Sequence, residues 1–220
     1  MWIGKFKIKH ECFILSKIKN NDLKVLAYVL GVHEDKKNLF YTTFLIPIGR
    51  DENKAKFIAD MKKDKQVISI EHINDQLITL TKVAKNKKHV SSNFTPDLFL
   101  IEPILHEKEH EYWHLASWDR EKLIAFYNKT KKTGEIEILK LQKEKPSSIF
   151  FPRIMPSLSK QQHKAFELAM EFGYYQYPQK VHLEDLAKVM KISRMTYREH
   201  LKKAQSKLIP FFANTIVQKE

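Results

Sequence analysis

The chain has little cysteine and no long apolar run, and each shortage excludes a class of protein. Its 220 residues include one cysteine, Cys12, so no disulfide can form within the chain and the thiol is read as a small buried apolar side chain. No apolar stretch approaches the roughly 18 residues needed to cross a bilayer. The first ten residues alternate apolar and basic side chains and lack the apolar core of a signal peptide. We therefore expect a cytoplasmic protein with no membrane partner.

Positive charge is in excess over the whole chain. The 39 Lys and Arg residues stand against 26 Asp and Glu, a formal net charge of +13. Residues 157–220 carry 11 basic and 6 acidic side chains, and residues 1–156 carry the other 28 and 20. A basic balance favours a polyanionic partner. Because the excess is spread over both segments, total charge does not locate a binding surface.

The spacing of apolar residues indicates where a binding surface lies. Residues 183–208 have the pattern of two helices joined by a short turn. Apolar residues recur at helical intervals in both halves, at Leu183, Leu186, Ala187 and Met190, and then at Tyr197, Leu201, Ala204 and Leu208. Ser193 stands where a hydroxyl caps the second helix. This is the layout of a helix-turn-helix, which places its second helix in the DNA major groove.

The second helix is predicted to carry its charge away from the buried stripe. Residues 188–207 include seven basic side chains and one acidic side chain. This excess of positive charge is typical of a surface that binds double-stranded DNA. Ser193 and Thr196, at a helix N-terminus, are predicted to hold phosphate. The side chains predicted to contact base edges are Arg194, Met195, Arg198 and Glu199. The side chains predicted to contact the phosphate backbone are Lys188, Lys191, Lys202, Lys203 and Lys207.

The same segment resembles the C-terminal domain of archaeal regulators of the bacterio-opsin-activator type. That pattern runs roughly L-T-x-x-Q, then A-x-x-x-G-Y-Y/F-x-x-P-R, then L-A-x-x-L-G-I-S-x-x-T-x-x-x-H-L-R-x-A-x-x-K-L. The matching positions are Leu158, Gln161 or Gln162, Ala169, Gly173, Tyr174, Tyr175, Pro178, Lys180, Leu186, Ala187, Ile192, Ser193, Thr196, His200, Leu201, Ala204, Lys207 and Leu208. The resemblance covers about 50 of the 220 residues. It implies a DNA-binding transcriptional regulator.

Three positions depart from the family pattern, and one of them, Met190, stands where leucine is more common and is expected in the core. Lys191 stands where the turn residue is usually glycine. Glycine suits a left-handed turn that costs other residues about 1 kcal/mol, so we expect either a strained Lys191 or a reshaped turn. Met195 replaces a small polar residue early on the second helix, where it either touches a thymine methyl or is merely exposed.

The first 145 residues show mixed strand and helix patterns. A strand–helix–strand unit occurs twice, near residues 39–73 and 111–141. Two such units joined through antiparallel strands predict an α+β domain with a ferredoxin-like or ACT-like sheet, followed by an all-α helix-turn-helix domain. Residues 98–105 are predicted to form one strand, and residues 84–97 a loop. Residues 1–145 are expected to sense an unknown small molecule, to dimerise or to contact a protein.

Residues 146–156 are predicted to link this domain to the DNA-binding domain at residues 157–220. Three prolines between residues 143 and 157 exclude regular structure, although the apolar side chains there should lie against one domain. Ser159 and Gln162 have the spacing of a capping box at the start of the next helix. A homodimer is expected, paired through an edge of the sheet or through residues 209–217, where Pro210 is predicted to interrupt the second helix.

One motif suggests an enzyme instead. Residues 106–110, HEKEH, match both H-E-x-x-H and H-x-x-E-H, the zinc-peptidase signatures. That chemistry needs a helix, whereas Pro103 and the flanking apolar runs predict the tip of a hairpin. A zinc hydrolase and a loose surface metal site using His106, His110 or His114 are therefore weaker alternatives, as is an interaction module docking on the transcription machinery. We expect no catalytic residue, no metal ion and no cofactor.

Overall fold

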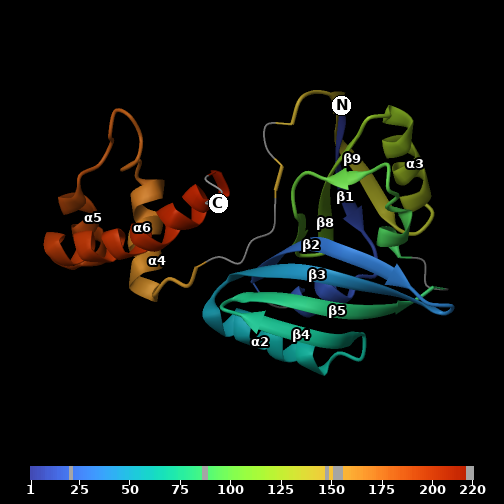
Figure 1. The fold of residues 1–220 in the computed structure, drawn as a ribbon, viewed down its shortest axis with the longest axis horizontal. Helices are drawn as coiled ribbons and strands as arrows, with labels where there is room; N and C mark the ends of the chain where they lie inside the picture. Colours follow the sequence, from blue (N-terminus) through green and yellow to red (C-terminus); the bar gives the residue numbers. More distant parts are fainter. Residues whose placement is uncertain (20–21, 86–88, 147–148, 151–155, 217–220) are drawn as a thin grey trace. The chain divides into compact units, whose positions relative to one another are not determined.

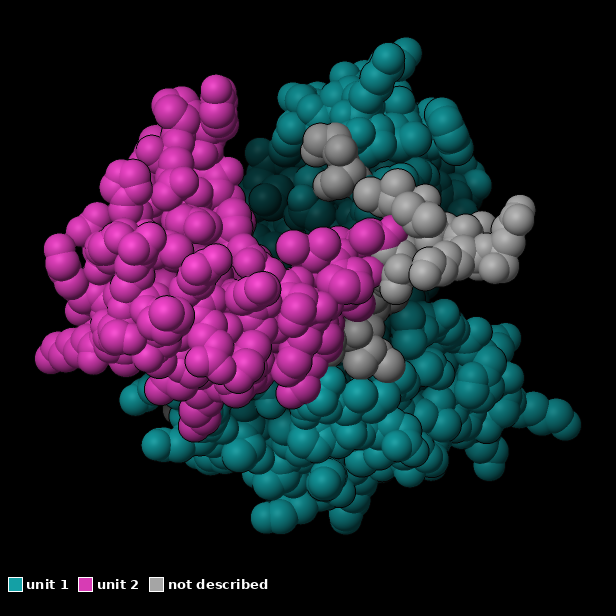
Figure 2. Space-filling model, turned by 60° about the vertical axis from the view of Figure 1, so that its left-hand side comes forward, with its two compact units in different colours: residues 1–153 teal, residues 154–220 magenta. Residues whose placement is uncertain are grey.

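The computed structural model describes residues 1–19, 22–85, 89–146, 149–150 and 156–216 (Figure 1). The chain divides into two compact units, which we call the sheet unit (Met1–Arg153) and the helical unit (Ile154–Glu220), coloured separately in Figure 2. Most of the predicted linker lies outside the described residues. Among the residues that are described, no helix is both long and apolar enough to cross a membrane.

The sheet unit is a nine-stranded sheet with the order β4-β5-β3-β2-β7-β8-β1-β9, and β6 pairs with β8. Its elements in chain order are β1 (Trp2–Lys9), α1 (Phe13–Ile18), β2 (Leu23–Glu34), β3 (Asn38–Gly49), α2 (Asp51–Lys63), β4 (Val67–Ile73), β5 (Gln76–Ala84), η1 (Val90–Asn93), β6 (Phe99–Leu100), β7 (Ile104–Glu107), β8 (His110–Ser117), α3 (Arg120–Thr130) and β9 (Glu135–Lys143).

Both predicted strand–helix–strand units are present, and a strand from elsewhere splits each of them. β5 lies between the strands of β3–α2–β4, and β1 lies between those of β8–α3–β9. Because each inserted strand is antiparallel to both neighbours, the two outer strands run parallel, as in a split βαβ unit. Residues 24–27 of β2 pair with residues 104–107 of β7 and join the halves into one sheet. The predicted α+β class is confirmed.

The helices cover one face of this sheet. Val25 lies opposite His106 across β2 and β7, and His106 lies opposite Glu111 across β7 and β8, so alternate residues of these strands share that face. On the β2 side, Leu23, Val25 and Ala27 pack with residues of α1 and α2. On the other side, Phe6, Ile8 and Trp113 pack with Leu123 and Phe126 of α3. Two apolar clusters therefore flank the β2–β7 junction.

Three segments of the sheet unit differ from the sequence prediction. Residues 98–105 form two strands, because Pro103 lies between them and has no N–H for the ladder. The predicted loop at residues 84–97 contains the short helix η1, whose first turn His89 caps. The six-residue helix α1 was not predicted, since so short a segment carries almost no periodic signal. Cys12, immediately before it, is buried as expected.

The helical unit contains α4 (Lys160–Glu171), α5 (Leu183–Met190) and α6 (Arg194–Ile216). The predicted capping box is present, because Gln162 N–H donates to Ser159 Oγ and Gln162 Oε1 accepts from Ser159 N–H. Side chains from all three helices form one core around Tyr197. The predicted interruption at Pro210 is wrong, since α6 continues through it. The fixed φ of proline is itself helical, and the cost is one lost backbone hydrogen bond and local crowding.

Candidate nucleic-acid interface

The turn between α5 and α6 keeps the left-handed geometry. Lys191 has φ 55° and ψ 42°. The N–H of Ile192 donates to the carbonyl of Ala187, and the N–H of Lys191 to that of Lys188. These two bonds are the Schellman ending that glycine usually completes. Of the two outcomes expected for this position, the strained lysine is the one observed.

Helix α6 begins with a closed side-chain cap. Ser193 Oγ accepts from the N–H of Thr196 at 3.0 Å, as predicted for an N-cap residue. The same oxygen lies 2.8 Å from Thr196 Oγ1. The two hydroxyls that were predicted to hold phosphate therefore contact each other. The remaining backbone N–H groups of the first turn keep the partial positive charge of a helix N-terminus.

The outward side of α6 follows from its buried stripe. Tyr197, Leu201, Ala204 and Leu208 are all buried. Helical periodicity places Met195, Glu199 and Lys202 roughly on the opposite side, and Met195 is 74% exposed. Arg198 and Lys202 lie at the flank of that side, where they line a shallow hollow with Tyr174, Leu183, Leu201 and Gln205.

Several of the predicted DNA-contacting cations already have partners. Arg194 pairs with Glu184 at 2.8 Å, Lys188 with Asp185 at 3.3 Å, and Lys203 with Glu199 at 2.6 Å. The hydrogen bond and charge of Lys203 lower the pKa of Glu199. Lys207 donates to the carbonyl of Ser157 and to Gln162 Oε1, so it is tied to the start of α4.

Three cations of the predicted set, Lys191, Arg198 and Lys202, form neither an ion pair nor a side-chain hydrogen bond with any described residue. Two of them share the hollow on the flank of α6. Gln205, which we did not predict as a site residue, lines the same hollow and donates to the hydroxyl of Tyr175. The signal in the sequence is its spacing, because residues 198, 202 and 205 are four and three apart and share a helix face.

The zinc-peptidase arrangement does not form at residues 106–110. These residues are the tip of the β7–β8 hairpin, as predicted, and Lys108 in its turn has φ 56°. His106 pairs with Glu111, whereas His110 pairs with Glu107. Side chains of successive residues on a strand point to opposite faces, so His106 and His110 lie on opposite sides of the sheet.

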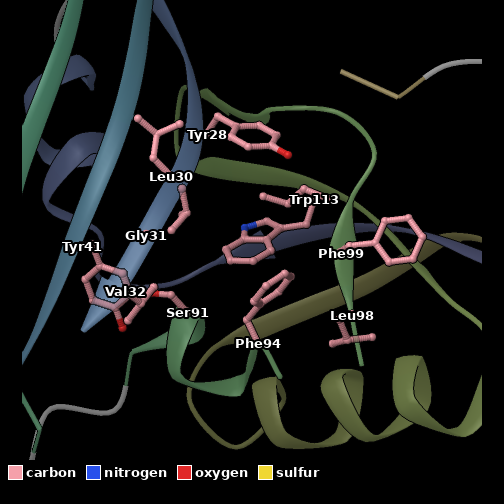
Figure 3. Close-up of a pocket in the computed structure, with 12 residues that line it drawn as sticks. Tyr28, Leu30, Gly31, Val32, Tyr41, Ser91, Phe94, Leu98, Phe99 and Trp113 are labelled. Carbon is pink, nitrogen blue, oxygen red and sulfur yellow. The ribbon is translucent and has the colours of Figure 1, made fainter. Parts of the chain in front are cut away.

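The sheet unit also holds an apolar pocket of about 330 Å³ (Figure 3). Aromatic and aliphatic side chains make up most of its lining, and two tyrosines and one serine add hydroxyl groups to it. The residues that line it are Tyr28, Val29, Leu30, Gly31, Val32, Tyr41, Ser91, Phe94, Leu98, Phe99, Leu100 and Trp113. A cavity of this size with few polar groups has the character of a small-molecule site.

Comparison with known proteins concerns the helical unit. Residues 158–210, which span α4, α5 and most of α6, match the family described as an HTH DNA binding domain. Residues 158–210 are a helix-turn-helix DNA binding domain. The chain is 38% identical over 52 residues to the transcriptional regulator NarO of Haloferax volcanii, a match covering 24% of this chain and 25% of that protein. The shared segment thus spans a quarter of the relative's length. No solved structure matches the chain.

These matches confirm the predicted resemblance to archaeal helix-turn-helix regulators for this segment. The domain has the strained turn at Lys191 in place of the usual glycine, and this substitution is a direct test of the turn. Replacing Lys191 by glycine is expected to relieve the left-handed strain and to stabilise the helical unit by a few tenths to ~1 kcal/mol.

The same substitution should weaken DNA binding, because it removes a cation beside the turn. The slope of log affinity against log salt should become shallower by about 0.9 if Lys191 neutralises one phosphate. Chemical denaturation measures the first effect and fluorescence anisotropy over a salt series the second. Lys191→Asn is the matched control, since asparagine tolerates the left-handed region and also removes the charge. An unchanged salt slope in both variants would show that Lys191 does not contact DNA.

Proposed function

We propose that this protein is a DNA-binding transcription regulator in which α6 reads the major groove. One observation carries the proposal most strongly. A helix-turn-helix domain presents Arg198 and Lys202 side by side on an exposed flank of α6, without an acidic partner among the described residues. Cations without an acidic partner attract a polyanion without first breaking an ion pair. We accordingly propose that the protein is cytoplasmic.

The other residues predicted to contact DNA differ in how readily they can reach it. Met195 is exposed near the start of α6, where an apolar side chain can meet a thymine methyl. Arg194, Lys188 and Lys203 reach DNA only by exchanging their carboxylate partners for phosphate or bases. Glu199, once released by Lys203, is placed to accept a hydrogen bond from a cytosine amino group. Ser193 and Thr196 leave the phosphate to the backbone N–H groups of the first turn.

Binding of the full chain to a randomised duplex pool, followed by selection, tests this function. Specific sequences should be enriched, and the affinity of the selected duplex should fall steeply with salt. Failure to bind any duplex even at low salt would favour the alternative in which the basic helix docks on an acidic surface of the transcription machinery.

We further propose that the protein acts as a homodimer, because one helix-turn-helix covers one half-site and paired half-sites lie about one DNA turn, ~34 Å, apart. Near the end of α6, Ile209 is 62% and Phe212 54% exposed. Val217, at the end of the predicted dimer surface, lies outside the described residues. The edge strands β4 and β9 are the second candidate surface.

Phe212→Ser should therefore convert a dimer into a monomer, since it removes apolar area from the contact. Light scattering at tens of micromolar protein measures the mass. The matched control is Ile68→Ser on β4, where the side chain is 47% exposed. If only Ile68→Ser gave the monomer, the sheet edge would be the interface, and a monomeric parent protein would contradict the homodimer.

The apolar pocket of the sheet unit is proposed as the site of a small effector molecule. Gly31 lies in its wall, and a Cβ built there meets no atom within 4 Å. Gly31→Leu should therefore fill the cavity without disturbing the strand, and should abolish the rise in melting temperature that an apolar aromatic ligand produces. Ile48→Leu on β3, outside the pocket, is the control. An equal thermal shift in the parent and in Gly31→Leu would place the ligand elsewhere.

A further inference from the structure

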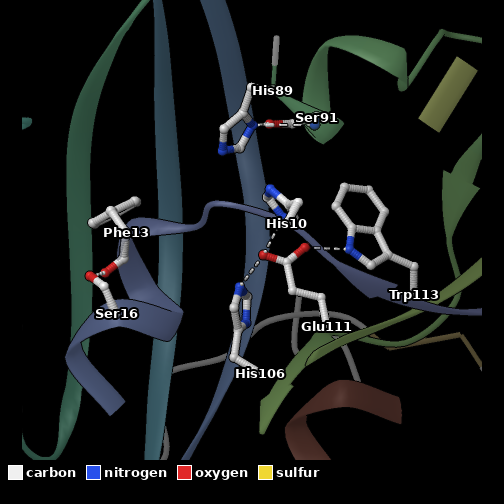
Figure 4. A network of polar contacts seen from close by, with 8 residues as sticks. All are labelled: His10, Phe13, Ser16, His89, Ser91, His106, Glu111 and Trp113. Carbon is white, nitrogen blue, oxygen red and sulfur yellow. Dashed lines mark hydrogen bonds and ion pairs between the residues drawn. The ribbon is translucent and has the colours of Figure 1, made fainter. Parts of the chain in front are cut away.

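A group of buried polar side chains lies between the two apolar clusters of the sheet unit. Figure 4 shows His10, His106, Glu111 and Trp113 from this region. Glu111 of β8 is at its centre and is 3% exposed. His106 is its neighbour on β7, and His10 and Cys12 come from the connection between β1 and α1. Four side chains from two distant segments of the sequence thus meet on the helix-covered face, beside the junction of the two halves.

The contacts converge on the Glu111 carboxylate. Trp113 Nε1 donates to its Oε2 at 2.7 Å. His10 Nε2 and His106 Nε2 lie 3.0 Å and 3.2 Å from its Oε1. Burial by itself raises the pKa of this carboxyl group, but the charge of His106 and the close approach of both histidines hold the pKa well below its ordinary value. Burying a carboxylate is costly unless hydrogen-bond donors or cations surround it, and three side chains surround this one.

One ring nitrogen of these buried histidines has no hydrogen-bond partner in the described part of the chain. Their side chains are only 3% and 4% exposed. His106 Nδ1 nevertheless makes no hydrogen bond with the described residues, and the contact of His10 Nε2 is its ion pair with Glu111. Buried polar atoms without a partner are rare in native proteins, and an ion or a water molecule is a common explanation.

The geometry is close to that of a metal site. His10, Cys12 and Glu111 each offer one ligand atom, and these nitrogen, sulfur and oxygen atoms all lie within 4.8 Å of one another. Ligand bonds of 2.0–2.3 Å in a tetrahedral zinc site place the ligand atoms about 3.3–3.8 Å apart. Shifts of about 1 Å or less, within reach of side-chain rotations, therefore suffice to bring the three atoms around one ion.

We propose that His10, Cys12 and Glu111 bind a divalent transition-metal ion of the zinc class. Imidazole, thiolate and carboxylate are the ligands that this ion takes in proteins. His106 and Trp113 act as positioning residues, because they hold the carboxylate from the neighbouring strand positions. The sequence predicted no metal, since its ligand residues lie about a hundred positions apart.

A small cavity of about 60 Å³ lies beside this cluster, and Cys12, His89, His106 and Glu111 help to line it. A space of roughly 10–15 Å³ is enough for one water molecule, so an open coordination position fits there. Tyr41, Ser91 and Trp113 line both this cavity and the larger apolar pocket. A molecule bound in the pocket would therefore lie close to the proposed metal site.

Metal titration of the full chain tests the proposal directly. Protein freed of metal by a chelator is titrated with Co²⁺, and bound Zn²⁺ is measured by mass spectrometry after dialysis. One ion per chain is expected, together with the thiolate-to-cobalt charge-transfer band and the visible bands of tetrahedral Co²⁺. Cys12→Ser should remove the charge-transfer band. His10→Gln and Glu111→Gln should weaken binding by at least tenfold, and His72→Gln, an exposed histidine of β4, should not change it.

A measurement on the unmodified chain guards against variants that fail to fold. Zn²⁺ should slow alkylation of Cys12, the only cysteine, in proportion to the bound fraction. Absence of stoichiometric metal in the folded parent protein would overturn the proposal and leave the cluster as a buried ion-pair network. Binding of one ion that neither His10→Gln nor Glu111→Gln weakens would overturn it as well. Neither result depends on DNA binding, so this site and the proposed regulator function fail separately.

Discussion

Tyr197→Ala is expected to unfold the helical unit and to abolish DNA binding with it. Tyr197 is fully buried at the centre of the core formed by α4, α5 and α6, and its hydroxyl donates to the carbonyl of Ala165 at 2.6 Å. Removing a large buried aromatic ring costs about 3–5 kcal/mol. At roughly 0.05–0.15 kcal/mol per residue, a unit of this size is stabilised by about 3–10 kcal/mol in all, so the loss is of the same order.

The hydroxyl and the ring of Tyr197 can be tested separately. Burial raises the pKa of Tyr197 to about 12, so the phenol stays protonated and remains a donor at neutral pH. Tyr197→Phe should cost about 1 kcal/mol, the usual net value of one hydrogen bond. Hydrogen exchange of the α6 amides measures both variants. Tyr127→Ala in the sheet unit is the control and should leave α6 unaffected. Equal protection of α6 in Tyr197→Ala and the parent would contradict the packing described here.

Arg198→Ala is expected to give the largest loss of specific DNA affinity among the surface variants. Arg198 is exposed, forms no ion pair with a described residue, and shares its hollow with Lys202. A bidentate contact from arginine to a guanine edge is worth about 1–3 kcal/mol, which is roughly a 5-fold to 150-fold change in affinity. The sequence preference should also relax at one base pair.

Lys202→Ala should behave differently, because a phosphate contact carries no sequence information. It should weaken binding to selected and unselected duplexes by a similar factor and make the salt slope shallower by about 0.9. Arg50→Ala in the sheet unit changes the net charge by the same amount and serves as the control. If Arg198→Ala and Arg50→Ala had the same effect on the selected duplex, α6 would not read bases through Arg198.

Local patterns in the sequence were sufficient for the helical unit. The apolar stripes of α5 and α6, the Ser193 cap and the Ser159–Gln162 capping box all depend on residues within four positions of each other. Short-range spacing therefore predicted these elements, whereas the family resemblance singled out Lys191 and left a strained residue or a reshaped turn as alternatives. What it did not predict is that Arg194, Lys188 and Lys203 already have acidic partners, because side-chain pairing between α5 and α6 depends on how those helices cross.

Proline shows the limit of a single-residue rule. Pro103 separates β6 from β7 as its missing N–H requires, yet Pro210 does not end α6. In a sheet the missing donor removes a bond to another strand, whereas in a helix the φ of proline is already correct. The surrounding structure therefore decides whether the same residue interrupts an element.

The sequence by itself determined the α+β class, both strand–helix–strand units and the helix-turn-helix domain, because strand and helix periods are local properties of the chain. Only the tertiary structure decided which distant residues meet. Sheet pairing of β1 with β8 and of β7 with β8 brings His10, Cys12, His106 and Glu111 together, although His10 and Glu111 are 101 positions apart. The same pairing directs His106 and His110 of one motif to opposite faces. Long-range register, which no local pattern encodes, places the buried cluster and the pocket beside it.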